Sequence, residues 1–375
     1  MKLFEYQAKE LFRDAGIAIP EGRVIQNMDA MPEALDTVGL PCVLKAQVLR
    51  GGRGKAGLIR VVRSADEAAT VADELFASEH GVHKLLVEQA LDINRELYLA
   101  ITVDPVSGKA LVMGSSEGGV DIETLAATAP DKIVKVPVDI TRGILPFQLR
   151  NMMFGLGLRK DAFKQGMKVL KALFGLFQAR DAELVEVNPL VVTAEGQLVA
   201  ADGKVSIDDN SSFRQEGLGA RSREQYDSDI EFEAAEAGFP YLQFDGEIGL
   251  MCAGAGLTNT VYDLIAAYGG TVANYLEFGG PNYRRAVEAM AFALRNNPKV
   301  LLIVTFGTIA RADVMAEGIA EAMAQLNPSV PSVTAIRGTN EEEATEILAG
   351  LGLEPLSNTE EAVKKAIALC RGASS

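Results

Sequence analysis

Apolar and polar positions follow two different patterns in the first and second parts of the chain. Up to about residue 206, short apolar runs are separated by turns more often than by helices, which favours antiparallel pairing. The expected strands are CVLKAQV, GLIRVV, KLLVEQAL, ELYLAITVD, LVEVNPLVV and QLVAADGKVSI. This part is therefore predicted to be an α+β domain.

The second part repeats a different unit, in which an apolar run ends in glycine and a helical pattern follows. The apolar runs are GEIGLMCAGAG, TVANYLEFGG, KVLLIVTFG and SVTAIRG. This alternation is typical of an α/β fold with a doubly wound parallel sheet. A polar, charged stretch separates the two patterns, so we expect one domain over residues 1–228, a linker over 229–241 and a second domain over 242–375.

The N-terminal stretch MKLFEYQAKELFRDAG predicts a folded helix rather than a targeting segment. Phe4, Ala8, Leu11 and Phe12 recur on one helical face, and Gly16 is a natural end point. The stretch is neither a signal peptide nor an Arg/Ser-rich transit peptide. The chain's three cysteines are far apart, which suits a reducing compartment. We therefore expect a cytoplasmic protein.

Composition and charge exclude several kinds of partner. The chain has 375 residues, of which 48% are hydrophobic, and a formal net charge of −15. Such a chain has enough apolar material for two or three cores and repels nucleic acid and anionic membranes. No apolar run approaches the ~20 residues of a membrane span. We expect no nucleic-acid partner and no membrane association.

Residues 50–57, RGGRGKAG, place cations among glycines in a chain that is otherwise acidic. Lys55 is followed by Ala56 and then by an apolar strand, so the stretch is not a Walker loop and is expected to cap a hairpin. Glycines allow backbone N–H groups to approach an anion, and Lys45 would point toward the same anion from the preceding strand. The neutralising cations would be Arg50, Arg53 and Lys55. A flexible surface hairpin with solvated cations fits the same pattern.

The stretch LVEVNPLVVTAEGQLVAADGK predicts a second hairpin, which would place two hard oxygen ligands together. A tight turn centred on Glu195 puts Asn188 directly across from Asp202, and cross-strand partners have Cβ atoms ~5 Å apart. An amide oxygen and a carboxylate are ligands that Mg²⁺ accepts. Glu186 projects to the same face, and Pro189 marks an edge or irregular strand. An ordinary hairpin with a wet polar face remains the alternative.

Glu88 and Glu96 are acidic positions on neighbouring expected strands. Carboxylates at such positions accept hydrogen bonds from ribose hydroxyl groups. They also fit the outward, solvated face of each strand.

Several of these stretches together resemble one family, the β subunits of succinyl-CoA synthetase, which belong to the ADP-forming acid–CoA ligases. The stretches are EYQAKELF, LKAQVLRGGRGKAG, ELYLAITVD, LVEVNPLVV and ADGK. The resemblance runs over essentially the whole chain in the same order. It implies an ATP-grasp domain followed by a flavodoxin-like CoA-ligase domain, in a ligase that forms a carbon–sulfur bond.

The resemblance also implies a site for Mg²⁺ and ATP. Nucleotide phosphates are implied at Lys45, Gly52, Arg53 and Gly54, and adenosine at Glu88 and Glu96. Asn188 and Asp202 match the Mg²⁺ ligands, and Glu186 matches a carboxylate that meets a phosphorylated histidine. Pro20 matches a position where proline accompanies a preference for ATP over GTP.

In this family the phosphohistidine and most of the CoA site belong to an α subunit, with which the β chain forms a heterodimer or heterotetramer. ATP phosphorylates that histidine, the phosphate passes to the carboxylic acid, and the CoA thiolate attacks the acyl phosphate. The family's role in the tricarboxylic acid cycle is implied as well. This chain has only two histidines, His80 and His83, and neither matches a functional position.

The acid-substrate end of the family site is matched by Ala253, Gly307, Thr308 and Ile309. The turn at Gly307 is expected to lead into a helix whose first N–H groups face phosphate or carboxylate, with Thr308 as its N-cap.

At this end the chain departs from the family pattern. Ala253 and Val304 stand where the family has asparagine, and Thr308 and Pro281 stand where it has glycine. One lost hydrogen bond to a charged group is worth roughly 1.5–3 kcal/mol, at least a tenfold change in preference. Three interpretations stay open: succinate in a rearranged pocket, a different small acid such as malate or a sulfonated acid, or neutral drift.

Two hypotheses from other classes also remain. One is a stand-alone ATP-grasp ligase that joins a carboxylate to an amine, which the second α/β pattern disfavours. The other is a non-catalytic nucleotide-binding homologue, which the intact Lys45, Asn188 and Asp202 disfavour.

Overall fold

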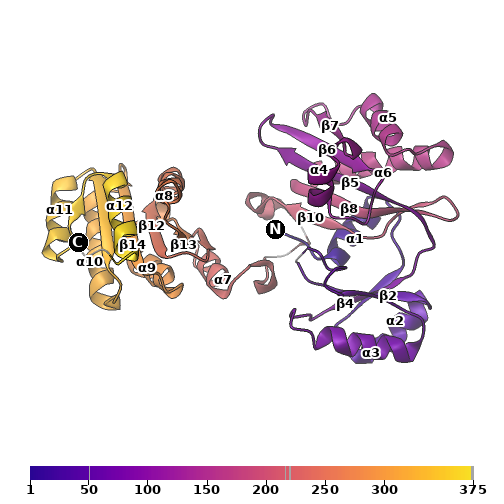
Figure 1. The fold of residues 1–375 in the computed structure, drawn as a ribbon, viewed down its shortest axis with the longest axis horizontal. Coiled ribbons are helices and arrows are strands. Elements are labelled where there is room, and N and C mark those ends of the chain that lie inside the picture. Colours follow the sequence, from indigo (N-terminus) through magenta and orange to yellow (C-terminus); the bar gives the residue numbers. More distant parts are fainter. Residues whose placement is uncertain (50, 216, 219–220, 373–375) are drawn as a thin grey trace. The chain divides into compact units, whose positions relative to one another are not determined.

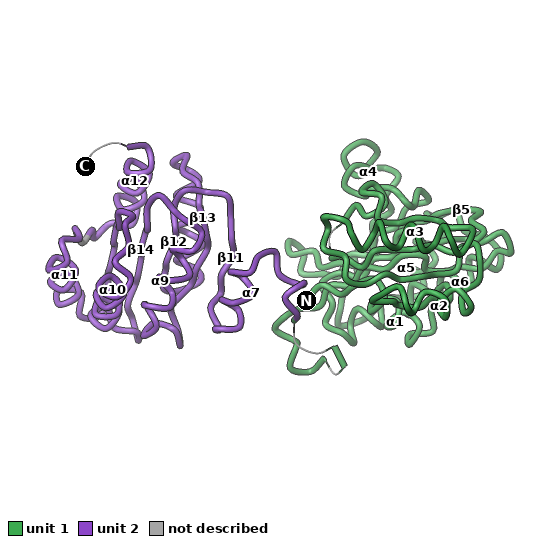
Figure 2. Tube along the Cα trace, turned by 90° about the horizontal axis from the view of Figure 1, so that it is seen from below, with its two compact units in different colours: residues 1–221 green, residues 222–375 purple. Residues whose placement is uncertain are grey.

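The computed structural model describes residues 1–49, 51–215, 217–218 and 221–372. The chain divides into two compact units, Met1–Arg221 and Ser222–Ser375, shown in different colours in Figure 2. Each unit has its own sheets and its own apolar cores. No helix among the described residues is both long enough and apolar enough to cross a membrane.

The first unit contains a four-stranded antiparallel sheet in the order β1-β4-β2-β3. Its strands are β1 (Gly22–Ile25), β2 (Cys42–Ala46), β3 (Ile59–Val62) and β4 (Leu85–Gln89). Helices α2 (Met31–Val38) and α3 (Ala65–Phe76) pack on this sheet and bury Leu44, Val62 and Leu85 (Figure 1). β2 and β3, which the glycine-rich stretch connects, pair with each other in antiparallel fashion, so the expected first hairpin is confirmed.

The second sheet of this unit is also antiparallel and has the order β10-β8-β5-β6-β7, with β9 paired to β8. Its strands are β5 (Ile93–Asp104), β6 (Lys109–Ser115), β7 (Val134–Val138), β8 (Ala182–Thr193), β9 (Leu198–Ala200) and β10 (Lys204–Ile207). The remaining helices of the first unit are α1 (Glu5–Asp14), α4 (Ile122–Thr128), α5 (Pro146–Gly155) and α6 (Lys160–Ala179).

The expected first helix is present as α1. Ala8, Leu11 and Phe12 are buried in the larger core of the unit, and Gly16 follows the helix with φ of +77°. The one expected strand QLVAADGKVSI is two strands, β9 and β10, because Ala201–Gly203 interrupts the ladder. Pro189 lies inside the central strand β8, next to an irregularity in its pairing with β5, and not at an edge.

The second unit is a three-layer α/β structure around one sheet in the order β11-β13-β12-β14-β15-β16. Its strands are β11 (Tyr241–Gln243), β12 (Ile248–Ala253), β13 (Val272–Leu276), β14 (Val300–Gly307), β15 (Ser332–Gly338) and β16 (Pro355–Leu356). All neighbours are parallel except β11, an antiparallel edge strand on β13. The predicted doubly wound α/β class is therefore confirmed, with a mostly parallel sheet.

Helices cover both faces of this sheet because its strands are apolar on both faces. Leu301 and Ile303 of β14 enter one core, while Leu302 and Val304 enter the other. The helices are α7 (Asp229–Glu236), α8 (Ala255–Ala267), α9 (Ala286–Arg295), α10 (Ala312–Leu326), α11 (Glu341–Gly350) and α12 (Thr359–Cys370).

Residues 229–241, expected to form a linker, contain α7 and reach the first residue of β11. The Gln243 backbone N–H donates to the Glu231 carboxylate across 2.8 Å, and β11 pairs with β13. This stretch is thus folded as part of the second unit.

Candidate active site

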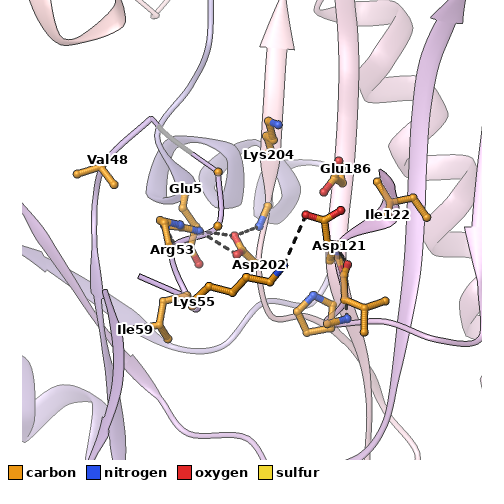
Figure 3. Close-up of a pocket in the computed structure, with 18 of the residues that line it drawn as sticks. Glu5, Val48, Arg53, Lys55, Ile59, Asp121, Ile122, Glu186, Asp202 and Lys204 are labelled. Atoms are coloured by element: carbon orange, nitrogen blue, oxygen red, sulfur yellow. Dashed lines mark hydrogen bonds and ion pairs between the residues drawn. The ribbon is translucent and has the colours of Figure 1, made fainter. Parts of the chain in front are cut away.

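A pocket of about 750 Å³ opens in the first unit, between the glycine-rich stretch and the second sheet. Three segments supply most of its polar groups: the loop Gly51–Lys55, the loop after β6, and the facing parts of β8 and β10 (Figure 3). Its lining includes Gly52, Arg53, Gly54, Glu96, Glu186, Asn188 and Asp202. Most of the first-unit site residues expected from the sequence therefore meet in one cavity. Arg50 lies outside the described residues.

The hairpin that was expected to hold two oxygen ligands has the expected register. β8 pairs Leu190 with Ala200 of β9 and Glu186 with Lys204 of β10. Asn188 lies midway between these pairs on β8 and is thus opposite Asp202. Both residues line the pocket, so an amide oxygen and a carboxylate are available on one wall. This donor set fits Mg²⁺, which prefers such oxygens.

Arg53 binds the Asp202 carboxylate. Its Nη2 is 2.8 Å from each carboxylate oxygen, and the Gly203 backbone N–H donates to Oδ1 across 2.7 Å (Figure 3). Burial raises the pKa of the Asp202 carboxyl above its ordinary value, and the Glu5 charge adds to this, while Arg53 opposes it.

At the pocket wall and behind it lies a largely buried group of charges, which we call the charge cluster: Glu5, Lys9, Lys45, Arg53, Glu88 and Asp202. Lys45 Nζ is 2.9 Å from Glu5 Oε1, 2.7 Å from Glu88 Oε2 and 2.6 Å from the Ala201 carbonyl oxygen. Burial alone would lower the pKa of Lys45, but the Glu5 and Glu88 carboxylates raise it. Three carboxylates and three cations balance, which a buried group of charges requires.

Lys45 and Glu88 do not line the pocket in the part of the chain that the structure describes. Glu88 is 2% exposed and pairs with Lys9 and Lys45. It borders a smaller cavity of about 180 Å³ that Pro20 also lines. Lys45 and Glu88 are connected to the pocket through Glu5 and Arg53, and the expected contact of Glu88 with adenosine stays a prediction.

Glu5 and Lys9 of α1 were not among the residues selected from the sequence. Both are almost fully buried, and the pKa of Glu5 is held well below its ordinary value, because three neighbouring cations outweigh the effect of burial. Their signal in the sequence is weak, since two charged residues one helical turn apart fit any solvated helix face.

The loop after β6 was also not anticipated as part of the site. Gly119 donates its N–H to Asn188 Oδ1 across 2.8 Å, and Asn188 donates its amide N–H to the Val120 carbonyl oxygen across 3.0 Å. A Cβ at Gly118 would lie 2.5 Å from the Leu97 backbone, so this loop needs glycine to lie on β5. Consecutive glycines between acidic residues, EGGVDIE, were the available signal.

Glu186 projects into the pocket from β8, near Lys204 (Figure 3). Burial raises the pKa of its carboxyl group above the ordinary glutamate value, and Lys204 partly opposes that rise.

In the second unit, the expected acid-end residues lie at the carboxyl edge of the sheet. Ala253 ends β12 and Gly307 ends β14, and these strands are neighbours. Gly307 and Gly338 approach so closely that a Cβ on Gly338 would lie 1.8 Å from the Gly307 carbonyl oxygen. Ile309 is 98% exposed.

The expectation that Thr308 caps the following helix is wrong. Helix α10 begins at Ala312, its N-cap is Arg311, and no side chain caps it. Its first N–H, that of Ala312, donates to the Thr339 carbonyl oxygen across 2.9 Å. Thr308 instead accepts a hydrogen bond from the Thr339 hydroxyl group at its own carbonyl oxygen.

Comparison with known proteins gives the class of both units. An ATP-grasp domain model matches residues 2–192, and a CoA-ligase model matches residues 251–369. The fold also resembles ATP citrate lyase from Methanothrix soehngenii, with a TM-score of 0.69, 19% identity, and coverage of 97% of this chain and 98% of that chain. The protein is therefore an ATP-grasp ligase with a CoA-ligase domain.

Curated relatives define the family more closely. The chain is 56% identical to the ADP-forming sulfoacetate-CoA ligase subunit SauC of Bilophila wadsworthia, over 99% of this chain and 100% of the relative. It is 53% identical to the corresponding SqwK subunit of an Acholeplasma species, over 99% of this chain and 92% of the relative. It is 42% identical to the succinate–CoA ligase β subunit of Ignicoccus hospitalis, over 100% of each chain. The chain belongs to this family and is the β subunit of an ADP-forming acid–CoA ligase, as the resemblance implied.

Proposed function

We propose that this chain is the nucleotide-binding subunit of an enzyme that joins sulfoacetate to CoA, with ATP converted to ADP and phosphate. The observation that carries this proposal is the full-length identity of 56% and 53% to two sulfoacetate-CoA ligase subunits. A succinate–CoA ligase β subunit is 42% identical over the same length. An enzyme for sulfoacetate would act outside the tricarboxylic acid cycle, the role that the family resemblance alone implied.

In this proposal the protein is cytoplasmic. The pocket of its first unit holds Mg-ATP. Gly52 and Gly54 offer backbone N–H groups to the phosphates, and Lys45 and Arg53 neutralise their charge. Glu88 and Glu96 serve adenosine, Glu88 from behind the pocket wall. Asn188 and Asp202 hold Mg²⁺, which supplies charge neutralisation to the transferring phosphate.

An α subunit completes the enzyme. The relatives are named as single subunits of their ligases, which supports a second subunit for this enzyme as well. The chain's two histidines lie outside the pocket lining among the described residues, so the phosphorylated histidine comes from the α subunit. That subunit also supplies most of the CoA site, and Glu186 receives its phosphohistidine at the pocket.

The departures at the acid end suit a sulfonate. A sulfonate carries three oxygens around sulfur, so it needs more room and a different set of donors than a carboxylate. Ala253 at the end of β12 provides room where the family has asparagine, and the exposed Thr308 adds a hydroxyl group.

The test is to co-express this chain with its α subunit and screen sulfoacetate, succinate, malate and acetate for CoA-dependent ADP release. We expect kcat/KM for sulfoacetate to exceed that for succinate at least about tenfold. Ala253→Asn should lower that ratio, whereas Ala194→Asn, at an exposed turn of the first unit, should not. Preference of the unaltered enzyme for succinate would refute sulfoacetate as the substrate.

A further inference from the structure

Both oxygens of Asp202 are bound by donors of the protein itself. Arg53 Nη2 lies 2.8 Å from Oδ1 and from Oδ2, while Arg53 Nη1 lies 2.6 Å from Glu5 Oε2 (Figure 3). The guanidinium group therefore joins two carboxylates at once. The side chains of Arg53 and Glu5 are 11% and 1% exposed and that of Asp202 is 25% exposed, so the Glu5 end of this bridge is shielded from water.

The oxygen of Asn188 is bound from the opposite wall. Gly119 donates its N–H to Asn188 Oδ1 across 2.8 Å. Lys55 of the glycine-rich loop and Asp121 of the facing loop approach to 3.8 Å across the pocket. The two oxygen groups proposed for Mg²⁺ thus each have a donor from a different loop.

Arg53 suits two kinds of partner. A guanidinium group presents a fork of N–H donors that matches carboxylate and phosphate equally. A divalent cation on the Asp202 oxygens would compete with Arg53, because two positive groups at contact distance from the same carboxylate repel each other. A nucleotide phosphate beside the loop offers Arg53 another anion.

We propose that Arg53 is an exchangeable counter-ion of Asp202, so that the divalent cation and the nucleotide bind as a cooperative pair. Arg53 passes from Asp202 to a nucleotide phosphate, and the cation takes its place on the carboxylate. Glu5 keeps hold of Nη1 and anchors the guanidinium group through the exchange. The inference rests on the proposed roles of Arg53 and Asp202, and it adds a coupling that those roles alone do not require.

The first test measures Mn²⁺ binding to the complex with its α subunit, by electron paramagnetic resonance and without nucleotide. Arg53→Met should bind Mn²⁺ about tenfold or more tightly than the unaltered enzyme, because the competing cation is gone. Lys55→Met is the matched control: it removes one positive charge from the same pocket, one whose ion pair is with Asp121. An equal gain in both variants, or no gain in Arg53→Met, would overturn the proposal.

The second test measures the affinity for metal-free ADP by titration calorimetry in the presence of a chelator. Asp202→Asn should bind metal-free ADP about tenfold more tightly than the unaltered enzyme, since Arg53 is released for phosphate. Asp121→Asn is the control with the same change of charge at another wall of the pocket. Unchanged affinity in Asp202→Asn, or the same gain in both variants, would contradict the exchange.

Two further measurements keep the outcomes separate. If circular dichroism shows that Arg53→Met does not fold, Arg53→Lys takes its place. The single ammonium group of lysine cannot bridge both carboxylates, so we expect a smaller gain in Mn²⁺ affinity for this variant. If the unaltered enzyme fails to bind Mn·ADP, the proposed function and this inference both fall. If it binds Mn·ADP but Arg53→Met gains no Mn²⁺ affinity, only the inference falls.

Discussion

The charged side chains of the charge cluster are stabilised mainly by one another rather than by water. In the charge cluster, Glu5 contacts Lys9, Lys45 and Arg53 together. Removing one member of such a group leaves a buried partner uncompensated, which is costly unless another partner remains. Arg53 has two carboxylate partners, so it keeps one of them, Glu5, when Asp202 is removed.

This second partner of Arg53 determines what we expect of Asp202→Ala. The variant should still fold and assemble, because Arg53 keeps Glu5 as a partner. Phosphorylation of the partner histidine by Mg-ATP should fall at least about 100-fold, since a metal contributes several kcal/mol to such a transfer. Radiolabelled ATP and native mass spectrometry measure the two properties. Asp263→Ala, at an exposed position of α8, should change neither, and near-normal phosphorylation of Asp202→Ala would show that the metal site is misassigned.

A second residue-scale prediction concerns acid stability in the other unit. Hydrogen bonds from Arg311 hold the pKa of the Asp313 carboxyl far below its ordinary value, and Asn340 adds a further donor. A lowered folded-state pKa stabilises the fold above the unfolded-state value of about 3.9, and this contribution is lost as pH falls toward the folded-state pKa. The stability advantage over Asp313→Asn should therefore be constant down to about pH 5 and shrink below about pH 4. Urea unfolding followed by circular dichroism measures it, and an advantage that grows on acidification would contradict the assignment.

At the scale of elements, the loop after β6 depends on two glycines. Gly118 lies against the backbone of Leu97 in β5, and Gly119 has φ of +70° with its N–H on Asn188. These two close approaches place the loop over one of the proposed metal ligands. The loop can lie this close to β5 and to Asn188 because neither glycine carries a side chain.

Gly118→Ala should displace this loop, because its Cβ would lie 2.5 Å from the Leu97 backbone. We expect a loss of about 1–3 kcal/mol of stability together with weaker Mg-ADP binding. Gly175→Ala is the matched control, since Gly175 is exposed in α6 and a Cβ there meets nothing within 4 Å. That change should raise stability by about 0.5–1 kcal/mol and leave binding unchanged. Thermal unfolding and calorimetry measure both, and equal effects of the two changes would contradict this account.

The elements that the sequence predicted well have strong local patterns. β12 to β15 and α8 to α11 were found because each strand is mostly apolar, ends near glycine and precedes an amphipathic helix. The register of the second hairpin followed from the length of its turn alone. The strands β1 and β7 were missed, because β1 is short and half-exposed and β7 contains proline. The strand β6 was missed as well, although it has seven residues and is mostly buried.

The parts of the site that were missed depend on contacts between distant segments. Lys9 meets Glu88 and the Ala201 carbonyl oxygen, and Glu5 meets Lys45, which no local periodicity reveals. The start of α10 was misplaced because Thr339, far later in the chain than Ala312, binds the first N–H of that helix. The roles of the site residues were assigned from the resemblance of their motifs. The structure adds the side chains and backbone groups that contact them.

At the scale of the whole molecule, the two units divide the expected chemistry. The pocket and charge cluster lie within Met1–Arg221, and the residues of the acid end lie within the second unit. Each unit has a separate apolar core, so neither needs the other to bury its strands.

A fragment comprising residues 1–221 should therefore fold alone and bind Mg-ADP within about threefold of the full chain's affinity. Calorimetry on the fragment and on the full chain tests this directly. Residues 222–375 should fold and show no binding of Mg-ADP. A fragment that folds but has lost nucleotide affinity would mean that the second unit contributes to the pocket.

The pairing of β8 with β9 and β10 has a consequence for how relatives of this protein can change in length. Asn188 faces Asp202 because the turn between Thr193 and Gln197 has a fixed number of residues. A single inserted or deleted residue there would turn one of the two oxygen groups to the opposite side of the sheet. Evolution can therefore lengthen surface loops such as the one between β5 and β6, whereas this small turn should keep its length in every relative that remains active.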